Sequence, residues 1–123
     1  LIKTGDVDMI MTAHIFLRKY DIKYPATLSK EIITGLLREE LGYDGVVISD
    51  DLKMGAIAGY YSKKQALNLM LNAGVDILLI SQSNFEEVEE IITLIEELLD
   101  EGKLEWSMIE KSIQRINAMK TKF

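Results

Sequence analysis

Gly45-Val46-Val47-Ile48-Ser49-Asp50-Asp51 is the stretch that decides the fold of this chain. Its three consecutive β-branched residues predict a short strand buried on both faces, as in a parallel sheet covered by helices. A carboxylate at the C-terminal end of such a strand lies where α/β folds bind their ligands. Because side chains alternate along a strand, Asp50 shares a face with Val46 and Ile48, and Asp51 lies on the other face. In a barrel filled by branched side chains, one acid would point into the mouth and its neighbour away from it.

Composition narrows the classes of function. The chain has 123 residues, a net charge of −6 and 48% hydrophobic residues, which predicts one soluble domain with an ample core. An acidic chain without basic clusters argues against nucleic acid or an anionic membrane as a partner. Cysteine is absent and histidine occurs once, so we expect no metal site, no disulfide and no cofactor. No apolar run has transmembrane length. The first residue is Leu1, so we expect a piece of a longer protein and leave its compartment open, favouring the cytoplasm.

Serines and glycines mark the other predicted elements. Ser29 and Ser62 can each cap a helix, Ser107 and Glu110 form a capping box for the last one, and Gly residues follow the helix ends. Between these residues, apolar stripes predict the helices and β-branched runs predict the strands. The predicted strands are Val7–Ala13, Val46–Ser49 and Val75–Ile80, and the predicted helices are Lys30–Glu40, one after Ser62, Phe85–Asp100 and one after Ser107.

The resulting order, β-α-β-α-β-α-α, is typical of right-handed βαβ crossovers in an α/β protein. We interpret it as three consecutive βα units of a (β/α)8 barrel, with parallel strands, plus a C-terminal helix. Three units are too few to close a barrel, which takes about 250 residues. We see no linker and no second domain within residues 1–123.

Several motifs together resemble glycoside hydrolase family 3. They are Met11-Thr-Ala-His, Pro25-Ala-Thr-Leu-Ser, Leu37-Arg-Glu-Glu-Leu-Gly, Gly45-Val-Val-Ile-Ser-Asp-Asp-Leu-Lys-Met and Asn72-Ala-Gly-Val-Asp-Ile-Leu-Leu. The similarity extends over nearly the whole chain and is strongest to the bacterial β-N-acetylhexosaminidases of the NagZ type. It implies that residues 1–123 are the C-terminal part of that family's N-terminal-type barrel domain. It also implies retaining hydrolysis of terminal β-linked N-acetylglucosamine.

The resemblance assigns the nucleophile to Asp50, the aspartate directly after Ser49, and strand alternation selects the same residue. Retaining hydrolysis needs a carboxylate within bonding reach of the anomeric carbon. His14 and Met54 are predicted substrate contacts, although His14 could instead be a hydrogen-bonded strand-end histidine and Met54 a loop-packing residue. Asp51 is expected to cap the next turn.

The family's acid/base is not among these residues. In this branch it is a histidine in an upstream loop with a Lys-His-Phe-Pro-Gly-His-Gly-type motif, which this sequence lacks. His14 follows a different motif. We therefore expect the isolated chain to be inactive. We also expect it to need the missing N-terminal half of the barrel as a partner and to self-associate through the open edges of its outer strands.

Two other interpretations remain open at this point. The chain could be a small stand-alone α/β binding module, receiver-like, in which Asp50 and Asp51 hold a divalent cation. A receiver also needs a phosphoacceptor aspartate and a lysine at other strand ends, whereas the third predicted strand is followed by Ser81-Gln82. Alternatively, the chain could be a natural split protein that pairs with a separate half.

Overall fold

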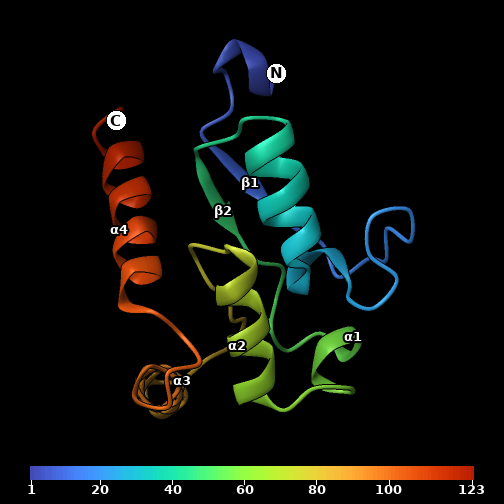
Figure 1. Cartoon of the computed structure of the whole chain (residues 1–123). Helices are drawn as coiled ribbons and strands as arrows, with labels where there is room; N and C mark the ends of the chain where they lie inside the picture. Colours follow the sequence, from blue (N-terminus) through green and yellow to red (C-terminus); the bar gives the residue numbers. More distant parts are fainter.

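Two short parallel strands and the helices around them form the chain, as seen in a computed structural model that describes residues 1–123. Figure 1 shows the strands side by side, with helices on either side of them and the two termini toward the same end. In chain order the elements are η1 (Ile2–Thr4), β1 (Met9–Met11), η2 (Ala26–Leu28), η3 (Glu31–Glu40), β2 (Val46–Ile48), α1 (Gly55–Ala58), α2 (Lys63–Ala73), α3 (Phe85–Asp100) and α4 (Trp106–Lys120).

Strand β2 is central, as its composition predicts. Val46 and Val47 project from opposite faces and both are fully buried, which confirms a strand covered on both sides. On one edge β2 pairs in parallel with β1, with Met9 opposite Val46 and Met11 opposite Ile48. The regular part of β1 is shorter than the predicted Val7–Ala13, and its two methionines are exposed.

The predicted third strand, Val75–Ile80, does not form a regular strand. It lies parallel to β2 on the other edge but makes only one bridge, Ile48 to Ile77. Side chains take part in two of the neighbouring bonds: the Asp76 carboxylate accepts the Val47 N–H at 2.9 Å, and Ser49 Oγ accepts the Leu79 N–H at 2.9 Å. The order β1, β2, segment 75–80 is therefore as predicted, whereas the three regular βα units are not.

Serine caps begin two of the helices at the predicted places. Ser29 Oγ accepts the Ile32 N–H at 3.2 Å at the start of η3. This helix is wound as a π-helix, and beyond it the Leu41 N–H bonds to the Leu36 carbonyl five residues back. Ser62 and Gln65 form a reciprocal capping box at the start of α2.

The capping box predicted at Ser107 and Glu110 is wrong. Helix α4 begins at Trp106 with Glu105 at its N-cap, and Ser107 Oγ lies 3.4 Å from Glu105 Oε2. The cause is the hydrogen bonding at the C-terminal end of α3. Leu104 is buried, and its N–H bonds to the Leu98 carbonyl at 3.2 Å. That anchor fixes where the chain turns, so the helix starts directly afterwards.

Helix α2 is the packing centre. It contacts η2, η3 and α3, and its Leu67 and Met70 are fully buried. The buried cluster also takes in Val47 of β2 and Leu98 of α3. Helix α4 lies against β2 (Figure 1), but none of its residues is fully buried, so its apolar side chains are only partly covered. None of the helices has both the length and the apolar character needed to cross a bilayer.

Candidate active site

Asp50 lies directly after β2, at the edge of the sheet where both parallel strands end. One carboxylate oxygen, Oδ1, accepts the N–H of Asp51 at 2.8 Å. The other, Oδ2, makes no hydrogen bond within the chain. The carboxylate is partly exposed and takes part in no ion pair. One oxygen is thus held by the backbone, while the second has no hydrogen-bond partner within the chain.

Asp51 has the different role that strand alternation predicts. Its Oδ1 accepts the N–H groups of Ser81 and Lys53, both at 3.1 Å. These hydrogen bonds, those from Ser81 foremost, hold the pKa of the Asp51 carboxyl below its usual value. Asp51 therefore caps the turn after β2 and fastens it to the loop that follows segment 75–80.

His14 follows β1 and reaches across to the same turn. Its Nε2 lies 2.8 Å from the carbonyl oxygen of Asp51, and its Nδ1 lies 3.0 Å from Oγ1 of Thr27. Oγ1 of Thr12 in turn donates to Oγ1 of Thr27 at 3.0 Å. Both ring nitrogens are thus engaged within the protein. The predicted substrate contact of His14 remains a prediction, and the geometry matches the hydrogen-bonded strand-end histidine that was its alternative.

Met54 lies at the N-cap of α1, and its side chain is 45% exposed. Its N–H bonds to the Asp51 carbonyl at 3.1 Å, so that carbonyl accepts from both Met54 and His14. The backbone of Met54 is held close to the acid pair while its side chain extends into solvent. Its substrate contact also remains a prediction.

Thr12 and Thr27 are the residues at this site that the sequence reading missed. Thr27 is fully buried in η2. The chain around it is tied to the end of β1, because the Ala26 N–H bonds to the Ile15 carbonyl at 2.8 Å. A signal was present for Thr12: it stands two residues before His14, and alternation along an extended chain puts both on one face.

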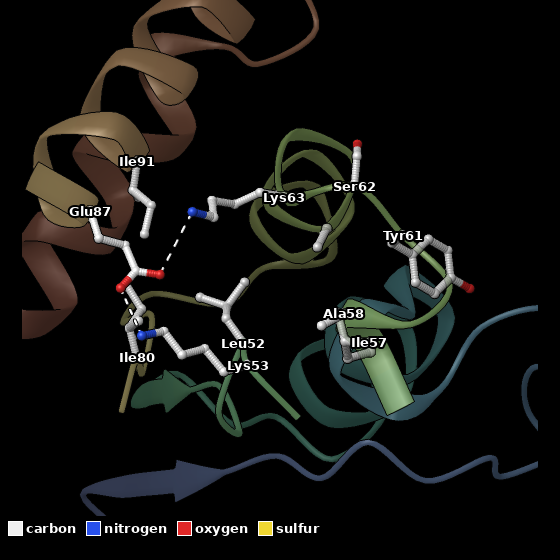
Figure 2. A pocket seen from close by; sticks show the side chains of 11 residues that line it. Leu52, Lys53, Ile57, Ala58, Tyr61, Ser62, Lys63, Ile80, Glu87 and Ile91 are labelled. Atoms are coloured by element: carbon white, nitrogen blue, oxygen red, sulfur yellow. Dashed lines mark ion pairs between the residues drawn. The ribbon is translucent and has the colours of Figure 1, made fainter. Parts of the chain in front are cut away.

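A pocket of about 400 Å³ lies beside the loop that follows the acid pair (Figure 2). Its walls come mainly from apolar residues of α1, α2 and α3 and the segments between them, including Leu52, Ile57 and Ile91. Glu87 points across it and pairs with Lys53 at 2.7 Å and Lys63 at 3.6 Å. Asp50 is not among the lining residues, so this pocket is separate from the candidate nucleophile.

The acid pair lacks the ligand set of a cation site. No group of three or more histidine, cysteine, aspartate or glutamate side chains converges anywhere in the structure. The Asp50 and Asp51 carboxylates each accept a different backbone N–H group. The receiver-like interpretation therefore finds no support in the geometry.

Residues 1–119 match the glycosyl hydrolase family 3 N-terminal domain. With the parallel strands and the strand-end acid, this match defines the class: the chain belongs to glycoside hydrolase family 3.

Several of the proteins similar to this chain are named β-hexosaminidases or β-N-acetylglucosaminidases. The chain is 34% identical to β-hexosaminidase A of Pseudoalteromonas piscicida, over 99% of this chain and 23% of that protein. It is 36% identical to the β-hexosaminidase of Bordetella pertussis, over 97% of this chain and 31% of that protein. A family 3 β-N-acetylglucosaminidase structure from Paenibacillus sp. str. FPU-7 superimposes with a TM-score of 0.88 and 36% identity, over 96% of this chain and 22% of the other. The chain thus spans between a fifth and a third of these relatives, and its fold matches part of the Paenibacillus structure.

Proposed function

We propose that residues 1–123 form the C-terminal part of the (β/α)8 domain of a retaining β-N-acetylglucosaminidase, with Asp50 as its nucleophile. The observation that carries the proposal is the position and hydrogen bonding of the Asp50 carboxylate. It lies where a parallel strand ends, with Oδ1 fixed by the Asp51 N–H and Oδ2 free. Family membership and the similarity to β-hexosaminidases along nearly the whole chain supply the substrate class, terminal N-acetylglucosaminides.

The chemistry follows from one free carboxylate oxygen. Oδ2 of Asp50 attacks the anomeric carbon, and the bond from that carbon to the leaving-group oxygen breaks. The leaving oxygen takes a proton from a general acid, and water then releases the sugar from Asp50 with its anomeric configuration retained. We propose that the general acid lies outside residues 1–123, in the remaining part of the barrel. Met54, four residues after Asp50, is proposed as a contact to the sugar.

The test uses p-nitrophenyl N-acetyl-β-glucosaminide as the substrate of the complete gene product. Asp50→Ala is expected to lower kcat by at least about 10³-fold, because the covalent route is lost. Asp44→Asn is the matched control: Asp44 precedes β2 at the opposite end of the strand, and its side chain is 96% exposed. Proton NMR of the first-formed product should show the β-anomer.

Three results would contradict the proposal. They are full activity of Asp50→Ala, formation of the α-anomer, and robust turnover by residues 1–123 alone. The last would mean that the chain contains its own general acid, whose usual contribution is a factor of about 10² to 10⁴.

A further inference from the structure

The hydrogen bonds of His14 define its tautomer. A carbonyl oxygen can only accept, so Nε2, which lies 2.8 Å from the Asp51 carbonyl, must carry the proton. In the neutral ring Nδ1 is then an acceptor, and the Thr27 hydroxyl at 3.0 Å must donate to it. The Thr27 oxygen in turn accepts from Thr12. The result is a relay with one direction, from Thr12 through Thr27 and His14 to the carbonyl of Asp51.

This relay ends on the residue that orients Asp50. Asp51 is held at three points: its carbonyl by His14, its carboxylate by the N–H groups of Ser81 and Lys53, and its own N–H by Asp50 Oδ1. Any movement of the Asp51 backbone would therefore move the group that holds Asp50. Thr27, at the other end, is fully buried and gives the relay a rigid anchor.

We infer that His14 is a positioning residue, which holds the Asp51 backbone so that the free oxygen of Asp50 faces the anomeric carbon. This inference rests on the proposed function. It assigns the His14 ring nitrogens to contacts within the protein and not to the substrate. Displacing a catalytic carboxylate by about 1 Å can lower the rate by about 10²-fold. His14 acts on Asp50 through Asp51, so its hydrogen bond should affect kcat. Substrate affinity should depend little on a ring whose nitrogens both face the protein.

The kinetic test compares three variants of the complete gene product. His14→Phe keeps a ring but removes both nitrogens and should lower kcat by about 10- to 100-fold with little change in KM. His14→Gln, whose amide N–H can reach the same carbonyl, should recover part of that loss. Thr27→Val removes the hydroxyl that fixes the tautomer and should lower kcat in the same direction. An increase in KM with unchanged kcat would establish a substrate contact and overturn the positioning role, as would full kcat in His14→Phe.

A spectroscopic test separates the relay from the enzymatic proposal. His14 is the only histidine within residues 1–123, and comparison with His14→Phe identifies its ring 15N NMR signals in the complete gene product. The relay predicts the Nε2–H tautomer for the neutral ring, and an increased share of the Nδ1–H tautomer in Thr27→Val. A neutral ring with the proton on Nδ1 in the unmodified gene product would overturn the relay. The NMR result does not depend on glycosidase activity. If the proposed function is wrong, the gene product will show no turnover, whereas the tautomer of His14 can still be as predicted.

Discussion

Nη2 of Arg38 lies 2.8 Å from Oδ2 of Asp76, a carboxylate that is completely buried. The same carboxylate accepts the Val47 N–H of β2 and the hydroxyl of Ser112 in α4, the latter at 2.7 Å, and it pairs with Arg115 at 3.1 Å. Asp76 thus joins η3, β2 and α4 near the end of the sheet where the strands begin. The candidate nucleophile lies at the opposite end, so this cluster is a structural element of the fold.

Asp76→Asn is therefore expected to destabilise the chain strongly. Removing one charge leaves two arginines facing a neutral group, and breaking a buried ion pair typically costs about 3–5 kcal/mol. Asp44→Asn is the control, because Asp44 also faces Arg115, at 3.5 Å, but from solvent. Its cost should stay within about 0.5 kcal/mol. Denaturant unfolding of both variants measures the difference, and equal stabilities would contradict the assigned role of Asp76.

Acid should weaken the contact between α2 and α3. Glu101, directly after α3, has Oε2 2.7 Å from Lys103 and Oε1 2.6 Å from Lys64 of α2. Hydrogen bonds from Lys103 and then Lys64 lower the pKa of Glu101 from 4.5 to about 2. A pKa lowered by folding contributes stability that is fully present above the unfolded value and lost as pH falls through the folded value. The free energy of unfolding should therefore decrease between pH 4.5 and 2.

Glu101→Gln should reduce that decrease, as measured by denaturant unfolding over a series of pH values. Glu96→Gln is the matched control, since Glu96 is an exposed glutamate of α3 without an ion pair. The same pH dependence in both variants would show that the lysine contacts of Glu101 do not contribute.

The isolated chain should self-associate. Strand β1 pairs only with β2, so its outer edge is open, and Met9 and Met11 are 46% and 57% exposed. The nearby Asp8 is paired with Lys122 at 2.6 Å, which leaves little unpaired charge to discourage edge pairing. Sedimentation velocity at micromolar concentration should show dimers or larger species. Met11→Lys should shift the population toward monomer, whereas Ile22→Lys, in an exposed loop, should not. A folded monomer at all concentrations would refute the open-edge prediction.

The sequence predicted the parts of the fold that depend on local pattern. The β-branched run Val46–Ile48, the serine caps at Ser29 and Ser62 and the parallel order of the strands are all confirmed. It could not predict the loss of regular pairing at segment 75–80, because Asp76 and Ser49 take ladder positions through contacts distant in sequence. The start of α4 was wrong because the turn after α3 closes at the buried Leu104, whose N–H bonds to the Leu98 carbonyl.

The candidate site, too, was predicted only in part. Alternation after β2 separated Asp50 from Asp51, and the structure gives the two carboxylates different partners. The relay to His14 depends on Thr27, fifteen residues beyond Thr12 in the chain and buried in η2, and no local pattern links them. The placement of acidic side chains at strand ends can thus be predicted from sequence, whereas the hydrogen-bond network around them depends on the fold.

Covalent trapping tests the central claim, the nucleophilic role of Asp50, most directly. The reagent is a glycosyl fluoride of N-acetylglucosamine with a second fluorine at C5, which slows release of the sugar from the enzyme after the leaving group has departed. The complete gene product is treated with it, digested with a protease and analysed by fragmentation mass spectrometry. The account predicts one sugar on the side chain of Asp50, and none in Asp50→Ala. A sugar on Asp51, or on a residue outside the chain, would contradict it.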